Sequence, residues 1–517
     1  MQPKRWIFVA GPDNRIQPAA MKPVWIFLLS TCLCVPAAWS EAECDSPTPA
    51  GIGEVREPAS AEATVEIAGQ SVPYRVTASE MVLKTDAGKP RATVFHVSYL
   101  RTDVDDISTR PVMFCFNGGP GSSAVWLHLG GVGPKRVDLP GDGTQAPLPP
   151  VRLLDNPFSV LDVADLVFVD PVSTGLSRID ETAGKKDDFH GLEGDIESMG
   201  DFVRRWITDH RRWGSPKYLL GESYGGIRVA GLSQSLQSRF GMNLNGVILL
   251  SSLLDFRTIV ETPGSDLSYQ VFLPAFAATA LHHGKLEGDR EAVVAAAREL
   301  ANGDFALALL QGTDLAAPEM REMADRLAAA SGLPADVWME HRLRVTPWVF
   351  RRELLREDGL TLGRFDARVA WETTDPASRR ADYDPSYSLV YGAFSTAMMD
   401  LLGNGLGWED HRKYEILTSN VHPWDWSASN RFVNVGDRLA RAIRDNPHLR
   451  VMVMAAYADL ATPPDGMLHS MRHMPGLIDG GRANFEFAEY ESGHMFYLYP
   501  PDLEKMREDL LRFITSP

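Results

Sequence analysis

One serine stands in a sequence context that suits a nucleophile. Ser223 is the centre of a G-x-S-x-G motif at 221–225. The apolar run 218–220 predicts a buried strand before the motif, and 227–236 predicts a helix after it. In this context the motif exposes a serine hydroxyl at a helix N-terminus, where negative charge is favoured. We therefore interpret Ser223 as a nucleophile; the alternative is a tight turn with an incidental serine.

A serine nucleophile needs a histidine as base and an acid that orients the histidine. His494 follows a predicted strand at 485–490, and Asp459 follows another at 450–455. The order serine, acid, histidine is that of α/β-hydrolases. We therefore expect Asp459 and His494 to complete a triad with Ser223.

Other assignments remain open for the acid and the histidine. Asp255 follows the predicted strand 247–250 and is the rival acid. Asp465 is nearer to His494 in sequence but lies beyond a Pro-Pro break. A histidine in this position also suits a capping or surface role.

Acyl transfer further needs two backbone N–H groups that bind the oxyanion. Tyr224, directly after the serine, supplies one of them in this type of elbow. The glycine-rich loop 117–123 follows the predicted strand 111–116 and is the candidate for the other. The alternative is a plain Gly/Pro turn, but the position of the loop in the strand order favours the oxyanion hole.

The elements that must position these residues alternate between strands and helices. This alternation predicts an α/β fold with a mostly parallel central sheet flanked by helices. The predicted strands are 64–67, 72–76, 92–99, 111–116, 166–169, 218–220, 247–250, 450–455 and 485–490. The predicted helices of this core are 202–213, 227–236 and 501–514.

The pattern changes between 256 and 410, where no buried strand is predicted. The predicted helices there are 291–300, 319–331 and 335–355, the last with a break at Pro347. We expect a helical lid at 256–410, inserted between two parts of the core, 61–255 and 411–517. Two of its aromatic residues, Trp348 and Phe350, are candidates for the pocket, with core packing as the alternative.

Composition excludes some classes of protein. A hydrophobic fraction of 44% and a charged fraction of 23% are typical of a globular protein. The net charge of -17 argues against nucleic acid as a partner. Cys115 lies within an apolar run and is expected to be a buried thiol rather than part of a disulfide framework.

The N-terminal residues predict export. Lys22 precedes an apolar run, 24–35, that is too short to span a bilayer and is followed by small residues. We expect a signal peptide at 1–42, with a possible upstream extension before Met21, and a periplasmic or secreted protein without stable membrane insertion after cleavage. The alternative is a membrane anchor. Residues 43–60, rich in Pro, Ala, Glu and Ser, are expected to form a disordered leader.

Several of these motifs together resemble one family, the serine carboxypeptidases of peptidase family S10. The motifs are Asn-Gly-Gly-Pro-Gly at 117–121, Asn-Pro at 156–157, Asp-Pro-Val-Ser-Thr-Gly-Leu-Ser at 170–177, Gly-Glu-Ser-Tyr at 221–224 and Gly-His-Met at 493–495. The likeness runs from about residue 90 to the C-terminus and is weakest in the insertion.

The resemblance implies an α/β-hydrolase fold with a lid and the removal of C-terminal residues from peptides that have a free C-terminus. It implies no metal and no cofactor. The implied site residues are the triad Ser223, Asp459 and His494, the oxyanion-hole residues Gly119 and Tyr224, and the substrate-binding residues Asn117, Gly118 and Glu222.

The sequence departs from the family pattern at three positions. Ala456-Tyr457 replaces Gly-Asp, which looks like a bacterial branch, and Ser122 replaces a cysteine. Gly131 replaces a glutamate that, in the family, shares a proton with the one beside the nucleophile. We therefore expect the pKa of Glu222 to be lower than in a paired site, and free-carboxylate peptides to bind well only below neutral pH. An esterase or acyltransferase on the same triad, or a binding protein that kept the fold, are the alternative functions.

Overall fold

A ten-stranded sheet forms the centre of the described part of the chain. The computed structural model describes residues 55–474 and 484–516, which belong to one compact unit. The sheet has the order β1-β2-β3-β7-β4-β9-β10-β13-β14, with β8 paired to β3. The strands are β1 (Ala59–Ile67), β2 (Gln70–Lys84), β3 (Pro90–Arg101), β4 (Val112–Phe116), β7 (Asp165–Val169), β8 (Arg178–Ile179), β9 (Lys217–Glu222), β10 (Gly246–Leu250), β13 (Arg450–Ala456) and β14 (Phe485–Tyr490).

The predicted α/β architecture is confirmed. From β7 to β14 every neighbouring pair in the sheet is parallel, whereas β1, β2 and β3 form an antiparallel edge. Strands β4, β7, β9 and β10 are buried at every position, as expected for parallel strands covered on both faces. The strands β4, β9 and β10 end side by side, since Phe116 pairs with Gly221 and Leu250 with Glu222.

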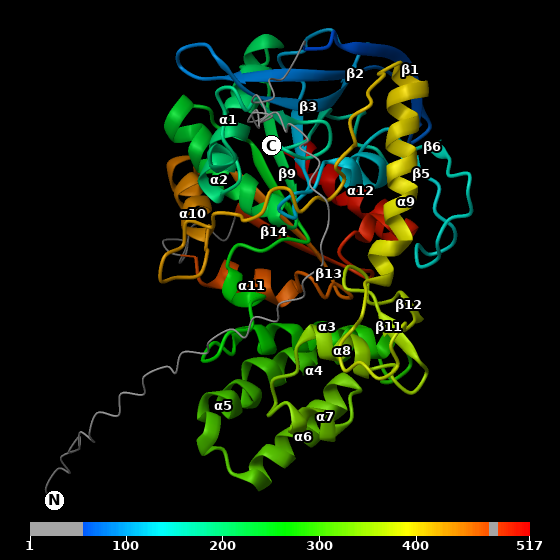
Figure 1. Ribbon diagram of the computed structural model, residues 1–517, viewed down its shortest axis with the longest axis vertical. Helices are drawn as coiled ribbons and strands as arrows, with labels where there is room; N and C mark the ends of the chain where they lie inside the picture. Colours follow the sequence, from blue (N-terminus) through cyan, green and yellow to red (C-terminus); the bar gives the residue numbers. More distant parts are fainter. Residues whose placement is uncertain (1–54, 475–483, 517) are drawn as a thin grey trace, which may run out of the picture. The chain divides into compact units, whose positions relative to one another are not determined.

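Helices cover both faces of the sheet. Because successive strand residues point to opposite faces, the core divides into two hydrophobic clusters. Helices α1 (Leu192–Asp209), α2 (Tyr224–Phe240) and α10 (Gly436–Asp445) contribute to one cluster. Helices α9 (Pro385–Asp400) and α12 (Pro500–Thr515) contribute to the other, and the two groups lie on opposite sides of the strands in Figure 1.

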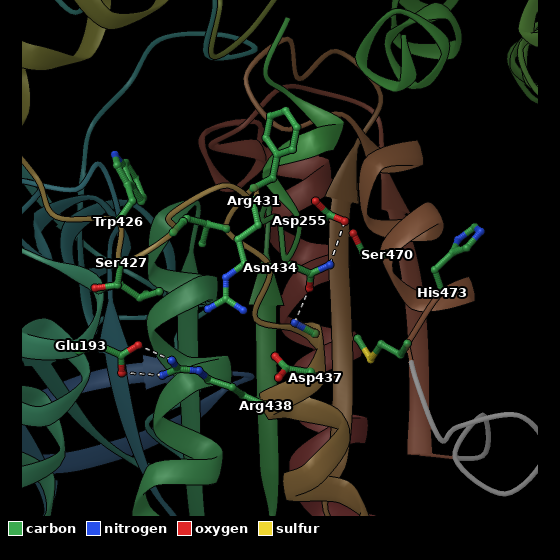
Figure 2. A pocket seen from close by; sticks show the side chains of 16 residues that line it. Glu193, Asp255, Trp426, Ser427, Arg431, Asn434, Asp437, Arg438, Ser470 and His473 are labelled. Atoms are coloured by element: carbon green, nitrogen blue, oxygen red, sulfur yellow. Dashed lines mark hydrogen bonds and ion pairs between the residues drawn. The ribbon is translucent and has the colours of Figure 1, made fainter. Parts of the chain in front are cut away.

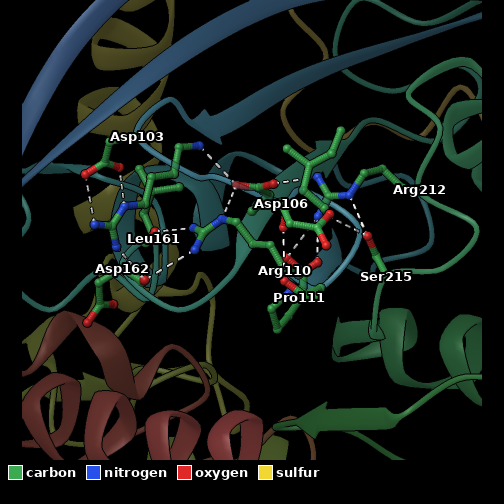
Figure 3. Close-up of polar contacts among 12 residues, drawn as sticks. Asp103, Asp106, Arg110, Pro111, Leu161, Asp162, Arg212 and Ser215 are labelled. Carbon is green, nitrogen blue, oxygen red and sulfur yellow. Dashed lines mark hydrogen bonds and ion pairs between the residues drawn. The ribbon is translucent and has the colours of Figure 1, made fainter.

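A buried ionic cluster joins the amino ends of three parallel strands, away from the ends where β4, β9 and β10 carry the candidate site. Asp165, the first residue of β7, accepts hydrogen bonds from Arg110 Nε (2.7 Å) and Arg212 Nη1 (2.6 Å). Arg110 also donates to the carbonyl of Leu161, and Arg212 donates to Ser215 Oγ, just before β9 (Figure 3). All three charged side chains are less than a tenth exposed. The cluster therefore ties the loops before β4, β7 and β9 together.

The insertion contains the expected helices. Its helices are α3 (Leu267–His282), α4 (Arg290–Asn302), α5 (Asp304–Gln311), α6 (Ala317–Ser331), α7 (Ala335–Glu340) and α8 (Pro347–Glu353). The break expected at Pro347 is present, because proline occupies the first turn of α8. Helix α3 packs against α11 (Pro464–Arg472) of the second core segment.

Two features of the insertion differ from expectation. Strands β11 (Leu360–Leu362) and β12 (Ala370–Glu372) form a small antiparallel sheet in 256–410, where no buried-strand pattern is present in the sequence. The strands are too short to give a recognisable alternation. In addition, α3 to α8 have a hydrophobic cluster of their own, which includes Ala458 and Leu460 from the core, whereas α9 belongs to the cluster on the sheet.

The segments predicted for export lie largely outside the described residues. These are the signal peptide expected at 1–42 and the leader as far as residue 54. Strand β1 begins at Ala59, so the last two residues of the leader expected at 43–60 are strand. Among the residues that the structure describes, no helix has both the length and the apolar composition needed to cross a bilayer. Cys115 is a fully buried free thiol, as expected.

Candidate active site

Ser223 occupies a sharp turn between β9 and α2. Its backbone has φ 59° and ψ −128°, a combination that non-glycine residues rarely adopt. The turn is so tight that a Cβ on Gly221 would lie 2.2 Å from the Gly225 carbonyl oxygen. A Cβ on Gly225 would lie 2.5 Å from the carbonyl oxygen of Phe116. The two glycines of the motif are therefore required by the backbone, and the strained residue between them is the serine.

Asp459 and His494 form a buried pair beyond the ends of β13 and β14. His494 Nδ1 lies 2.7 Å from Asp459 Oδ2, and both side chains are almost completely buried. The other carboxylate oxygen accepts hydrogen bonds from the backbone N–H groups of Ala461 (2.7 Å) and Thr462 (2.9 Å). The Thr462 hydroxyl donates to Asp459 Oδ2 (2.8 Å). The carboxylate is thus held in place and oriented toward the imidazole.

The electrostatic surroundings raise the pKa of His494. Burial alone would lower its pKa, but the Asp459 carboxylate and its hydrogen bond, together with Glu222, outweigh burial and raise the pKa. A hydrogen bond from Nδ1–H to Asp459 leaves Nε2 as the basic nitrogen. This is the arrangement that a general base next to a serine requires.

The two rival acids are engaged elsewhere. Asp255 forms an ion pair with Arg257 and accepts a hydrogen bond from Asn434 Nδ2 (2.8 Å). Asp255 and Asn434 line a separate pocket, which neither Ser223 nor His494 lines and whose volume is about 290 Å³ (Figure 2). Asp465 forms an ion pair with Arg298 at 2.6 Å.

A single cavity brings Ser223 and His494 together. Its volume is about 540 Å³, which suits a small peptide or amino-acid group. Three groups of residues form its walls: the glycine-rich loop, the serine turn, and segments from the insertion and the chain after it. The lining residues are Asn117, Gly118, Gly119, Pro120, Ser122, Trp126, Glu222, Ser223, Arg364, Phe365, Tyr387, Leu417, Thr418, Ser419, His422, His494 and Met495.

The glycine-rich loop packs directly on the backbone of the serine turn. A Cβ on Gly118 would lie 2.4 Å from the backbone nitrogen of Tyr224 and 2.7 Å from the carbonyl oxygen of Glu222. Gly119 has φ 101°, a conformation that favours glycine. Among the described residues, no backbone carbonyl accepts a hydrogen bond from the N–H groups of Gly119 or Tyr224. Both N–H groups are therefore available to a bound oxygen.

Glu222 is buried beside Ser223 and has a tyrosine as its partner. Burial raises its pKa to about 7, and the Tyr497 hydroxyl, which donates to Glu222 Oε2 (2.7 Å), works in the opposite direction. The resemblance implies a second carboxylate at position 131, where this chain has a glycine. The Tyr497 ring packs against this glycine, since a Cβ on Gly131 would lie 3.5 Å from the ring. A tyrosine hydroxyl, not a second carboxylate, thus hydrogen-bonds to Glu222.

Asn117 links the glycine-rich loop to the same region. Its Oδ1 accepts a hydrogen bond from the Leu127 N–H group (3.1 Å), and the side chain is 1% exposed. Its Nδ2 donates to no residue that the structure describes. Asn117 is nevertheless close enough to Glu222 to lower the pKa of that carboxyl group. The amide is thus a buried donor near Glu222, at the wall of the cavity.

Several wall residues were not predicted from the sequence. The aromatic candidates Trp348 and Phe350 do not line the cavity: Trp348 is 47% exposed, and Phe350 is fully buried and stacks on Phe276. The insertion contributes Phe365 and Tyr387 instead, in segments without a motif.

Comparison with known proteins gives partial sequence matches. The serine carboxypeptidase family model matches residues 88–276, a range that includes Asn117 and Ser223. Serine carboxypeptidase-like 36 of Arabidopsis thaliana is 28% identical over 169 residues, which cover 31% of this chain and 32% of the relative. The lysosomal protective protein of Mus musculus is 27% identical over 165 residues, which cover 31% and 32%. The matched region is thus about a third of the length of these relatives.

Comparison with solved structures supports the fold over most of the chain. Kex1(delta)p, a prohormone-processing carboxypeptidase from Saccharomyces cerevisiae, has a TM-score of 0.53 at 16% sequence identity. The alignment covers 85% of this chain and 91% of that one. Residues 88–276 are thus similar to the serine carboxypeptidase family, and the chain has the α/β-hydrolase fold.

Proposed function

We propose that the protein is a serine carboxypeptidase that uses Ser223, His494 and Asp459 as its catalytic triad. The observation that carries the proposal is the cavity, which is lined by a strained serine and by a histidine already hydrogen-bonded to a buried aspartate. A nucleophile, a base and an orienting acid in this order are the requirements of acyl transfer through a covalent intermediate.

The proposed reaction has two half-reactions. Ser223 Oγ attacks the carbonyl carbon of the last peptide bond, and its proton passes to His494 Nε2. The oxygen that becomes negative is bound by the N–H groups of Gly119 and Tyr224. His494 then gives its proton to the leaving amine, the C–N bond breaks, and an acyl-enzyme remains. His494 then deprotonates a water molecule, which attacks the acyl-enzyme ester. The shortened peptide is released, and His494 returns the proton to Ser223 Oγ.

The substrate's terminal carboxylate is proposed to bind beside the serine. Asn117 Nδ2 offers a hydrogen-bond donor, and the loop at Gly118 approaches closely enough for backbone contact. Glu222 can donate a hydrogen bond to a carboxylate only when it is protonated, which a pKa of about 7 allows below neutral pH. Peptides with a free C-terminus are therefore expected to bind better below pH 7 than above it.

The second candidate is an esterase or acyltransferase on the same triad. The observation that favours it is the tyrosine in the place of the second carboxylate, since the family's proton-sharing pair is absent at Gly131 and Glu222. Rates with an N-blocked dipeptide, its C-terminal amide and the matching ester separate the two functions. A carboxypeptidase prefers the free acid to the amide, whereas ester cleavage without peptide cleavage would support the alternative.

The insertion is proposed to act as a wall and lid for this site. The backbone N–H group of His494 donates a hydrogen bond to the carbonyl of Phe365 (2.5 Å). The Phe365 ring stacks on the His494 imidazole, with ring centroids 5.2 Å apart. The carbonyl of Arg364 accepts a hydrogen bond from the Leu460 N–H group (3.1 Å). Removing the Phe365 ring should therefore lower kcat through loss of imidazole positioning. Unchanged kcat in Phe365→Ala would contradict this role.

Export is proposed from the sequence at 1–42. Expression of the full chain, fractionation and N-terminal sequencing would test it. Mature protein beginning near residue 43 in an exported fraction supports the prediction, and an intact N-terminus in the cytoplasm contradicts it.

A further inference from the structure

An arginine of the insertion lies at the wall of the active-site cavity with no acidic partner. Arg364 lines the same cavity as Ser223 and His494 and is partly buried. Its guanidinium carbon lies 5.4 Å from the centroid of the Phe365 ring. It forms no ion pair with any carboxylate in the part of the chain that the structure describes. A cation in this setting lacks the compensation that partly buried charges usually have.

The acidic side chains near Arg364 are already engaged. Asp366 forms an ion pair with Arg368 at 2.7 Å. The Asp384 carboxylate lies 3.9 Å from the Arg351 guanidinium. It also accepts hydrogen bonds from the backbone N–H group of Arg364 (2.9 Å) and from the Ser386 hydroxyl. These contacts fix the backbone of Arg364 while its guanidinium remains available.

Arg364 lies on the His494 side of the cavity, next to the Phe365 ring. In acyl transfer the imidazole donates its proton to the leaving amine, so the leaving residue lies next to the histidine. The Phe365 ring stacks on the His494 imidazole, and the Arg364 guanidinium packs on the Phe365 ring. Its charge is also close enough to oppose protonation of His494. A leaving residue placed next to His494 would therefore lie near Arg364.

The chemistry of the guanidinium selects the partner. A planar fork of N–H donors matches a carboxylate in a bidentate arrangement, and this pair is stronger than a neutral hydrogen bond. The leaving residue of a carboxypeptidase substrate always carries an α-carboxylate, and it carries a second carboxylate when it is Asp or Glu. We propose that Arg364 binds a carboxylate of the substrate's C-terminal residue. This inference rests on the proposed function of the site.

The experiment measures how peptides inhibit hydrolysis of a reporter ester whose leaving group has no carboxylate. Inhibition constants are obtained for two pairs of N-blocked dipeptides: a C-terminal Leu as free acid and as amide, and a C-terminal Glu against Gln, both as free acids. Wild type is compared with Arg364→Met, which keeps the length of the side chain and removes the charge. Arg364→Lys keeps the charge but loses the fork. Arg380→Met, in an exposed part of the insertion outside the cavity, is the matched control.

The proposal predicts that one of the two preferences weakens in Arg364→Met by about 10- to 100-fold, the range for a charge-assisted pair. Loss of the acid-over-amide preference assigns Arg364 to the α-carboxylate, and loss of the Glu-over-Gln preference assigns it to the side chain. Arg364→Lys should restore part of the effect, and Arg380→Met should match wild type. Thermal unfolding verifies that the variants fold.

The proposal is overturned when both preferences are the same in Arg364→Met as in wild type. Its failure can be distinguished from failure of the proposed function, because inhibition of ester hydrolysis does not require that the peptides are cleaved. Consumption of the same dipeptides, followed by chromatography, reports on the carboxypeptidase activity separately.

Discussion

The hydrogen bond between Tyr497 and Glu222 should set the pH above which peptides with a free C-terminus stop binding. In Tyr497→Phe the ring remains, so its contact with Gly131 is kept, and only the hydroxyl that lies 2.7 Å from Glu222 Oε2 is lost. That hydroxyl stabilises the ionised carboxylate and lowers its pKa. Its removal should therefore raise the pKa of Glu222 above the wild-type value of about 7.

The size of the change follows from the energy of the bond. A hydrogen bond to a charged group contributes about 1.5–3 kcal/mol, and about 1.4 kcal/mol corresponds to one pKa unit. With the lower value, the pKa of Glu222 should rise by about one pH unit. Since the protonated form is the one that donates to a carboxylate, a higher pKa extends peptide binding to higher pH.

The assay is KM against pH for an N-blocked dipeptide and its amide. In wild type, KM of the free acid should rise above about pH 7 while KM of the amide does not. In Tyr497→Phe the rise should move up by about one unit. Titration of His494 affects both substrates and cancels in the comparison. The control is Tyr383→Phe. This variant also loses a tyrosine hydroxyl, which donates a hydrogen bond to the carbonyl of Glu372 outside the cavity.

Parallel profiles for the acid and the amide in wild type would show that Glu222 does not contact the carboxylate. A shift of the rise in KM to lower pH in Tyr497→Phe would show that the Tyr497 hydroxyl does not stabilise ionised Glu222. Glu222→Gln should make KM of the free acid independent of pH in this range.

Two further predictions concern the acid of the triad and the ionic cluster. Asp459→Asn should lower kcat by about 10³–10⁴ with little change in KM, because His494 is no longer held in the correct tautomer, whereas Asp255→Asn should not lower kcat. Steady-state kinetics measures both, and the opposite result would make Asp255 the acid. Asp165→Asn should lower the free energy of unfolding by about 3 kcal/mol, because two buried guanidinium groups lose their counter-charge, while KM is unchanged. Urea denaturation measures this loss, and a change below about 0.5 kcal/mol, as at ordinary surface positions, would contradict it.

The parts of the fold that the sequence predicted are those with local signals. Fully buried parallel strands are continuous apolar runs, and the serine turn has glycines wherever a Cβ would collide with the backbone. Ser223, Asp459 and His494 each follow a predicted strand, in the order serine, acid, histidine along the chain. These signals need no knowledge of distant contacts, which is why they were sufficient.

Other residues of the site were unpredictable because their roles depend on distant contacts. Tyr497 hydrogen-bonds to Glu222, 275 positions away in sequence, and no pattern around either residue indicates it. Arg364 and Phe365 follow a strand of three residues, too short for a period-two pattern. Helix α9 is apolar over much of its surface, so its sequence did not distinguish packing on the sheet from packing within the insertion.

The central claim is that Ser223 is the nucleophile, and labelling tests it most directly. Wild type and Ser223→Ala are treated with a fluorophosphonate, digested and analysed by mass spectrometry, and hydrolysis of an N-blocked dipeptide is measured on the same preparations. The account predicts one label per chain, on the peptide that contains Ser223. It also predicts loss of both label and activity, by several orders of magnitude, in a variant whose thermal unfolding is unchanged. Label on a different residue, or wild-type hydrolysis by Ser223→Ala, would contradict it.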